Sequence, residues 1–187
     1  MAFSINEIKS GVTILVDGEV YIALETQHVK PGKGAAFVRA KLRNLRNNGI
    51  QDKTFRGDEK IEAAFVEERK LQYQYSSGSM YHFMDQDNFE EIAVSETCLG
   101  DKKRFLKDNL EVSGYFYKNE TLNISLPNFI EFKIIHTEPG IKGDTAKSSM
   151  KPAKIETGAN VQVPLFIDIA DKIKVDTRTG EYVEKAY

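Results

Sequence analysis

Short runs in which apolar and polar residues alternate, separated by tight-turn dipeptides, recur along almost the whole chain. In residues 12–24, alternate apolar positions stand on both sides of the dipeptide Asp17-Gly18. A period of two places successive side chains on opposite faces of a β-strand, and Asp-Gly is favoured in two-residue hairpin turns. The longest uninterrupted apolar stretches hold only a few residues, whereas a membrane-spanning helix needs about 20. The pattern therefore predicts an all-β protein assembled from hairpins, with the final hairpin turning at Thr179-Gly180.

The composition changes at two points of the 187-residue chain, and these points suggest three β units. We expect the units to span residues 1–63, 64–127 and 128–187. Units of this size bury only about 60% of their unfolded surface, so packing between neighbours would help to stabilise them. The second and third units fit small closed barrels of the oligonucleotide-binding (OB) type best. Residues 100–110 are the best helix candidate, and residues 138–152 are expected to form a polar loop.

The net charge of −2 conceals an uneven distribution between the three units. The first carries +2, the second −4 and the third zero. Six cations lie between Glu25 and Asp52 with no acid among them: Lys30, Lys33, Arg39, Lys41, Arg43 and Arg46. A pI of about 6.0 argues against a nonspecific binder of nucleic acid. The cation block nevertheless predicts a local face that binds a polyanion.

Residues 36–43 combine the cations with the alternating pattern. If this segment is a strand, its two faces differ completely, because successive side chains point to opposite sides. One face is small and apolar, with Ala36, Val38, Ala40 and Leu42. The other carries Phe37, Arg39, Lys41 and Arg43. This arrangement is more specific than an irregular run of charge.

The loop before that strand reads Lys30-Pro31-Gly32-Lys33-Gly34. Proline stiffens one side of the loop, and glycines flank the lysine and permit positive φ. One interpretation is an ordinary turn with a solvated lysine. The other, favoured by the basic strand that follows, is a cationic hairpin tip that contacts the phosphates of a folded RNA. If Gly32 adopts positive φ, a β-branched residue at that position would redirect the tip.

The sequence lacks the residue patterns of the common enzyme classes. There is no nucleophile elbow, no zinc-protease motif and no Walker A motif. His28, His82 and His136 fall in three different units and are interpreted as ordinary structural or surface residues. A single cysteine, Cys98, excludes an internal disulfide. The N-terminus lacks a basic stretch followed by an apolar core, so we expect a cytoplasmic protein without a signal peptide. Because the common catalytic and metal-binding motifs are missing, we also expect no enzymatic activity, metal or cofactor.

A second loop of interest contains Gly143-Asp144-Thr145. Its small and polar composition is typical of a mobile surface loop. The alternative is a backbone-rich surface that meets nucleic acid.

Seven segments of the sequence together resemble the bacterial elongation factor P family. They are residues 29–39, 41–45, 53–55, 138–146, 151–153, 163–166 and 173–183. The resemblance extends over essentially the whole chain. It implies an L-shaped, tRNA-like molecule with an SH3-like, KOW-type N-terminal barrel followed by two OB barrels.

The resemblance also implies a function and its partners. Members of the family bind the 70S ribosome between the peptidyl-tRNA and exit sites, and they promote peptide bond formation where consecutive prolines cause stalling. We therefore expect a translation factor that acts as a monomer and does not associate with a membrane.

Individual residues acquire roles from the same resemblance. Lys33 matches the tip residue that reaches toward the CCA end of the peptidyl-tRNA and that a lysine-modifying enzyme extends in many members. The tRNA-contacting set is then Lys30, Pro31, Gly32, Lys33, Gly34, Arg39, Lys41 and Arg43. Gly143, Asp144 and Thr145 match a loop that approaches the exit-site mRNA codon. The alternative is a carrier protein whose cofactor is attached to the hairpin lysine, as in biotinyl and lipoyl domains.

Overall fold

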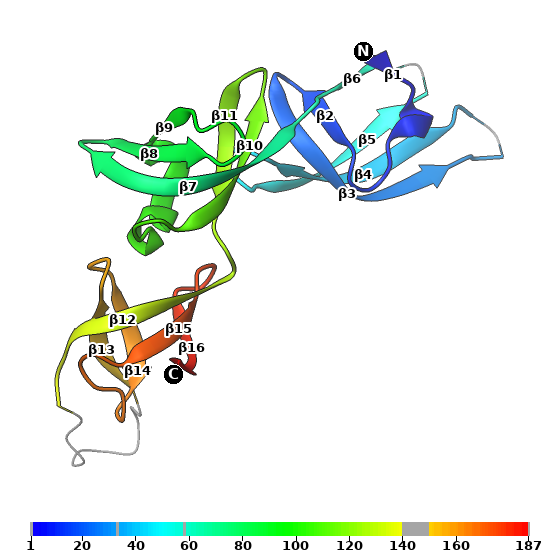
Figure 1. The fold of residues 1–187 in the computed structure, drawn as a ribbon. Coiled ribbons are helices and arrows are strands. Elements are labelled where there is room, and N and C mark those ends of the chain that lie inside the picture. The colour runs from blue at the N-terminus through cyan, green and yellow to red at the C-terminus, as the bar shows by residue number, and fades with distance from the viewer. Residues whose placement is uncertain (1, 33, 58, 140–149, 187) are drawn as a thin grey trace. The chain divides into compact units, whose positions relative to one another are not determined.

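A computed structural model describes residues 2–32, 34–57, 59–139 and 150–186 (Figure 1). These residues contain sixteen strands, one short α-helix and two 3-10 turns. The strands form one six-stranded and two five-stranded sheets. The all-β prediction is confirmed.

The first sheet has the strand order β1-β6-β2-β3-β4-β5. Its strands are β1 (Ala2–Phe3), β6 (Ile61–Ala63), β2 (Thr13–Val16), β3 (Glu19–Val29), β4 (Phe37–Asn44) and β5 (Ile50–Arg56). The register of β3 against β4 shifts between Ala23 and Glu25. Irregularities of this kind bend a strand and curl a sheet. The curled sheet encloses a core in which Ile8, Ile14 and Leu42 are fully buried.

The hairpin predicted at Asp17-Gly18 is present between β2 and β3. Asp17 has φ of 52° and Gly18 has φ of 83°. Positive φ at both central residues is the requirement of the type I′ turn, which Asp-Gly meets at low cost. The hairpin predicted at Thr179-Gly180 is also present, with Gly180 at φ of 78°.

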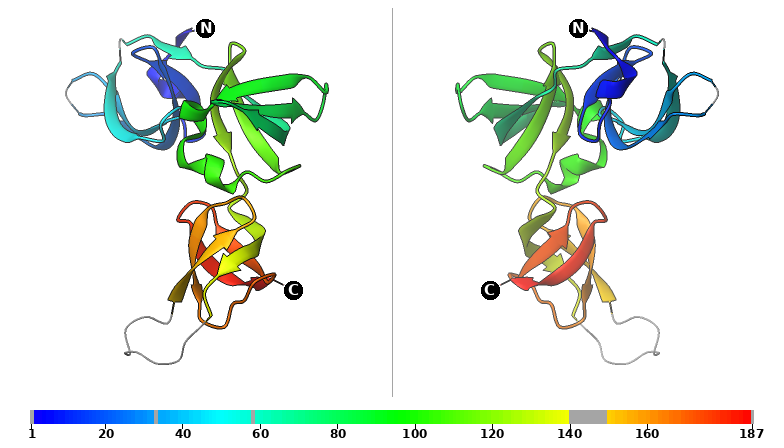
Figure 2. Two further views of the ribbon diagram at one scale, coloured as in Figure 1. Left: turned by 90° about the vertical axis from the view of Figure 1, so that its left-hand side faces the viewer. Right: turned by 90° about the vertical axis from the view of Figure 1, so that its right-hand side faces the viewer.

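The second and third sheets have the orders β11-β10-β7-β8-β9 and β14-β13-β12-β15-β16. The second consists of β11 (Glu120–Ser125), β10 (Glu111–Tyr117), β7 (Glu67–Ser77), β8 (Met80–Asp85) and β9 (Glu91–Ser95). The third consists of β14 (Asn160–Pro164), β13 (Met150–Ile155), β12 (Phe129–Thr137), β15 (Lys172–Asp176) and β16 (Glu181–Ala186). Figure 2 shows the third sheet, coloured yellow to red, curled into a small barrel. Phe132, Ile134 and Ile155 are among its buried core residues.

The chain separates into two compact units. One comprises residues 1–69 with 114–124, and the other residues 70–113 with 125–187. The three expected domains, 1–63, 64–127 and 128–187, do not coincide with these units. Their boundaries therefore stay predictions.

Two local predictions were wrong. The helix expected over 100–110 is a short α1 (Glu96–Leu99) that continues as a 3-10 turn, Gly100–Phe105. Gly100 has φ of 55° and ends the α-helix, and Leu106 is already extended. The polar loop expected over 138–152 does not extend to residue 152, because β13 begins at Met150 and places Lys151 inside the third sheet. Lys151 and Pro152 are uncommon in strands, so the sequence pattern did not indicate β13.

Candidate nucleic-acid interface

The β3–β4 hairpin carries most of the predicted contact residues. Val29 pairs with Phe37, so residues 30–36 connect the two strands and position 33 is the midpoint of the connection. Lys33 itself lies outside the described residues. Lys30 is exposed and Pro31 is half-buried on the side of the loop that leaves β3.

The two glycines of the loop differ in conformation. Gly34 has φ of 114°, a value that side chains with a Cβ rarely adopt. Gly32 is not among the glycines with positive φ, and a Cβ added to it would meet nothing within 4 Å. The condition placed on Gly32 is therefore not met, and the conformational requirement belongs to Gly34.

Strand β4 has the two faces that its sequence predicts. Val38, Ala40 and Leu42 are at most 2% exposed and point into the core. Arg39 is exposed and Lys41 is half-buried on the opposite face. The alternation of β4 is therefore confirmed, and it directs cations out of the barrel.

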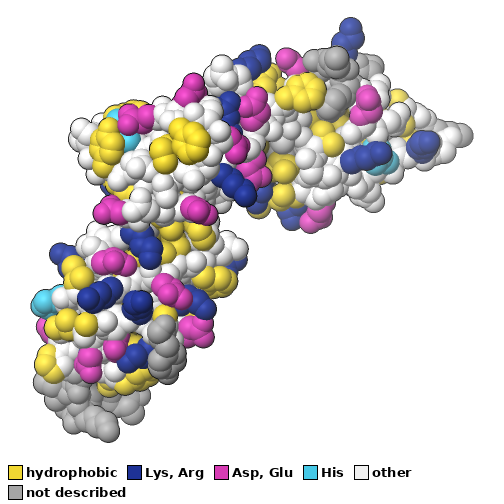
Figure 3. Space-filling view, viewed as in Figure 1, with side chains coloured by type: hydrophobic (Ala, Val, Ile, Leu, Met, Phe, Trp, Pro, Cys, Tyr) yellow, Lys and Arg dark blue, Asp and Glu magenta, His cyan; other side chains and the backbone are white. Residues whose placement is uncertain are grey.

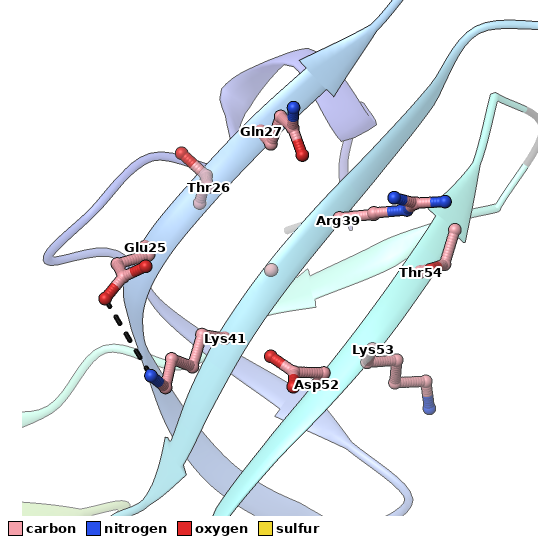
Figure 4. A pocket seen from close by; sticks show the side chains of 9 residues that line it. Glu25, Thr26, Gln27, Arg39, Lys41, Asp52, Lys53 and Thr54 are labelled. Atoms are coloured by element: carbon pink, nitrogen blue, oxygen red, sulfur yellow. Dashed lines mark ion pairs between the residues drawn. The ribbon is translucent and has the colours of Figure 1, made fainter.

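Residues from both neighbouring strands complete this outer face and line an open groove (Figure 4). Arg39 stands between Gln27 of β3 and Thr54 of β5. Lys41 stands between Glu25 and Asp52 in the same way. The groove is lined by Glu25, Thr26, Gln27, Arg39, Ala40, Lys41, Asp52, Lys53 and Thr54.

The cations of the groove are not equivalent. Lys41 Nζ lies 3.9 Å from Glu25 Oε1, and Lys53 Nζ lies 3.2 Å from Asp17 Oδ2. Figure 4 shows the side chain of Lys41 directed toward Glu25, whereas that of Arg39 extends toward Thr54. The Arg39 guanidinium lies 5.5 Å from the centre of the Phe37 ring. No described acid forms an ion pair with it, which leaves its charge available for a ligand.

Two further cations of the block face other parts of their own compact unit. Arg46 Nη2 lies 2.9 Å from Glu120 Oε1, and its Nε lies 3.8 Å from Glu19 Oε2. Arg43 lies near Tyr115, where its charge opposes the rise in the pKa of that phenol caused chiefly by burial. The acid-free run of cations in the sequence is therefore not a continuous basic face in the structure. On the face drawn in Figure 3, basic and acidic side chains are likewise interspersed.

Sequence reasoning missed the acids and amides of the groove. Glu25 and Asp52 bound the cation block in the chain but lie inside the face that it forms, because antiparallel pairing brings them beside Lys41. The alternation of cations in residues 36–43 was the one signal that pointed to the groove. The sequence of strand β5 contained no such signal, because most of its residues are exposed and lack an apolar alternation.

The second predicted site, Gly143-Asp144-Thr145, lies outside the described residues. The structure describes the chain on either side of it, through Pro139 and from Met150. Lys151 follows immediately and is 6% exposed.

The remaining polar clusters form local contacts. His28 Nε2 lies 3.1 Å from the carbonyl oxygen of Ile8, and His82 Nδ1 lies 2.9 Å from Glu91 Oε1. Within the described part of the chain, no three His, Cys, Asp or Glu side chains are grouped as a metal site. No helix in that part is long and apolar enough to cross a membrane.

Three domain families match the chain in succession. The KOW-like domain of elongation factor P matches residues 4–61, and its OB domain matches residues 66–124. The C-terminal domain of elongation factor P matches residues 122–185. These matches agree with the KOW-type and OB-type barrels expected from the sequence.

Curated relatives and solved structures agree with these matches. Elongation factor P of Natranaerobius thermophilus is 52% identical over 180 residues, which cover 96% of both chains. That of Moorella thermoacetica is 50% identical over 183 residues, covering 98% of this chain and 99% of its own. The fold also resembles eukaryotic translation initiation factor 5A from Methanococcus jannaschii, with a TM-score of 0.52 and 19% identity over 66% of this chain and 93% of that one. The chain thus belongs to the elongation factor P family and is a translation elongation factor.

Proposed function

We propose that this protein binds the ribosome between the peptidyl-tRNA and exit sites and stimulates peptide bond formation at consecutive prolines. The observation that carries the proposal is the β3–β4 hairpin. Its register centres the connecting loop on position 33, and its outer face presents Arg39, which has no ion-pair partner among the described residues. A cationic tip above a mixed polar strand suits recognition of folded RNA by shape and backbone.

The proposed mechanism is positional. The ribosome supplies the reaction centre, and the hairpin holds a poorly reactive peptidyl-tRNA close to its attack geometry. Correct positioning can lower a barrier by up to about 7–11 kcal/mol in favourable cases, and a stalled substrate needs only part of this. Lys33 transfers no proton in this mechanism, and the protein acts without enzymatic activity or cofactor.

We rank the proposed tRNA contacts by the charges and burial around each cation. Arg39 offers a guanidinium without a described ion-pair partner, and an arginine can form two parallel hydrogen bonds to one phosphate. Lys41 must share its charge with Glu25, so its contribution is smaller. Arg43 is half-buried and contributes least. Lys30, Pro31, Gly32 and Gly34 supply backbone and shape around Lys33.

A second contact is proposed for the segment that connects β12 to β13 in the sequence. Gly143, Asp144 and Thr145 approach the exit-site mRNA codon, while the hairpin lies at the peptidyl-tRNA. The protein acts as a cytoplasmic monomer. If Lys33 is modified, a lysine-modifying enzyme is a further partner.

A reconstituted translation system tests the proposal. Two templates, one with three consecutive prolines and one with three alanines, are translated with and without the purified protein. We expect the protein to accelerate synthesis across the prolines and to leave the alanine template unchanged. Equal effects on both templates would contradict the proposal. Peptide mass spectrometry of the native protein identifies any group on Lys33.

A further inference from the structure

A lysine is buried inside the barrel of the third sheet. Strand β13 alternates exposed and buried residues, and its inward positions are Lys151, Ala153 and Ile155. Their exposed fractions are 6%, 3% and 0%. Lys154 is exposed on the outer face of the same strand. Lys151 therefore occupies a core position that an apolar residue would normally fill.

The ammonium group of Lys151 contacts the backbone at the adjacent C-terminal end of the neighbouring strand, β12. Its Nζ donates a hydrogen bond of 2.7 Å to the carbonyl oxygen of Glu138, the residue after β12. It also lies 3.8 Å from Asp168 Oδ1, but the Asp168 side chain is 79% exposed. A second link lies beside it, where Thr137 Oγ1 donates to the carbonyl oxygen of Pro152 at 3.0 Å.

Stability alone does not account for a cation at this position. Removing an ammonium group from water is costly, and well-packed apolar residues can replace buried ion pairs at little or no loss of stability. What the lysine supplies is a directional bond to Glu138. That bond joins the last residues before segment 140–149 to the first residues after it.

We propose that Lys151 is a positioning residue that holds the C-terminal end of β12 beside the N-terminal end of β13. It thereby determines where the chain leaves and re-enters the barrel around the segment assigned to the mRNA codon. The consequence for translation rests on the proposed function, but the link between Glu138 and Lys151 does not.

Hydrogen exchange on the isolated protein tests the link. Lys151→Met keeps the length and apolar stem of the side chain and removes its charge and donors. The matched control is Lys154→Met, which removes the same charge from the exposed face of the same strand. A hydrogen bond from a charged donor contributes about 1.5–3 kcal/mol, so we expect exchange of the peptide spanning the end of β12 to accelerate roughly tenfold or more in Lys151→Met alone.

The melting temperature separates positioning from general stability. We expect Lys151→Met to melt within a few degrees of the wild type, because methionine fills the same volume and removes the cost of burying a charge, which offsets the lost hydrogen bond. Exchange equal in the two variants would overturn the proposal. So would faster exchange over the whole third sheet, since that result means a loss of global stability.

A measurement on the unaltered protein covers the case in which Lys151→Met does not fold. The ammonium protons of a buried, hydrogen-bonded lysine exchange slowly enough with water to be observed by NMR of the ¹⁵N-labelled side chain. We expect a signal for Lys151 Nζ and none for the exposed Lys154. Equally fast exchange at both lysines would contradict the proposal.

Stall rescue then distinguishes the two proposals. If Lys151→Met accelerates exchange at β12 and lowers rescue while Lys154→Met does neither, both are supported. If exchange accelerates and rescue is unchanged, Lys151 still positions the strand ends, and the role of Gly143, Asp144 and Thr145 at the codon fails instead.

Discussion

Strands β4 and β13 use cationic side chains in opposite ways. In β4, Val38, Ala40 and Leu42 are buried and Arg39 projects outward beside a groove. In β13, Lys151 points inward and Lys154 outward. The outward cation of β4 is available to a partner, while the inward cation of β13 is bound to the backbone of its own chain.

The comparison shows that two features decide whether a cation in a β protein is available to a partner. They are the face of the strand on which the side chain lies and the charges on the neighbouring strands. Glu25 partly neutralises Lys41, although the sequence between Glu25 and Asp52 contains no acid. Antiparallel pairing brings such residues together across the sheet. We therefore expect only part of the basic block to act on RNA.

The two glycines of the hairpin loop provide the largest expected contrast. Gly34→Val places a β-branched residue at φ of 114°, where strain of about 1–3 kcal/mol favours another loop conformation. We expect stall rescue to fall by roughly tenfold or more. Gly32→Val is the control, because Gly32 lacks positive φ and has open space around it. Equal losses in both variants, measured in the proline-template assay, would show that bulk rather than conformation matters.

The salt dependence of ribosome binding separates Arg39 from Lys41. Each phosphate contact contributes roughly 0.7–0.9 to the slope of log affinity against log salt. We expect Arg39→Gln to flatten the slope by about this amount and Lys41→Gln by clearly less, because Lys41 is paired with Glu25. Filter binding or sedimentation across a salt series measures both. Identical slopes for the two variants would remove the distinction drawn from the structure.

Arg46 should affect the fold and not RNA binding. Its contacts with Glu19 and Glu120 are half-exposed, and exposed ion pairs contribute about 0.2–1 kcal/mol each. We expect Arg46→Gln to lower the melting temperature by a few degrees without changing the salt slope. A double-mutant cycle with Glu120→Gln measures the pair directly. A flattened salt slope in Arg46→Gln would instead add Arg46 to the residues that contact RNA.

The smallest expected effect is on the pKa of Asp176, which forms an ion pair with Arg178 two residues away. Hydrogen bonds from Arg178 lower the pKa of Asp176 to about 2. In the unfolded chain this pKa is about 3.9. Ionised Asp176 therefore stabilises the fold fully above pH of about 3.9, and the stabilisation is lost as the pH falls through about 2. In Arg178→Gln, an NMR titration of the Asp176 carboxyl carbon should give a pKa closer to 3.9, and an unchanged pKa would contradict this assignment.

The sequence predicted those parts of the fold that depend on local chemistry. The hairpins at Asp17-Gly18 and Thr179-Gly180 follow from turn residues that tolerate positive φ, and the faces of β4 follow from a period of two. Strand β5 was not recognised because it is mostly exposed, and β13 was not recognised because Lys151 occupies a core position. Tertiary contacts outweighed local patterning in both strands.

The candidate site was predicted to a similar extent. Arg39 and its outward direction follow from the sequence of β4 alone. The partners of Lys41 and Arg46 do not, since Glu120 lies 74 residues from Arg46 in the chain. The choice between Gly32 and Gly34 as the residue with positive φ also required the structure, because both flank Lys33 equally in the sequence.

The central claim is that the hairpin tip acts on the ribosome and contributes almost nothing to the fold. Substitutions away from special packing features usually change stability by no more than about 0.5 kcal/mol. Lys33→Ala removes both the reach and the charge of the tip, and the flanking glycines provide no side chains for Lys33 to pack against.

The most direct measurement compares the melting temperature of Lys33→Ala with its stall rescue, using protein from a host that modifies the wild type normally. We predict a melting temperature within a few degrees of the wild type and the loss of most stimulation at consecutive prolines. Wild-type rescue by Lys33→Ala would contradict the proposed function, and joint loss of fold and activity would make Lys33 a structural residue.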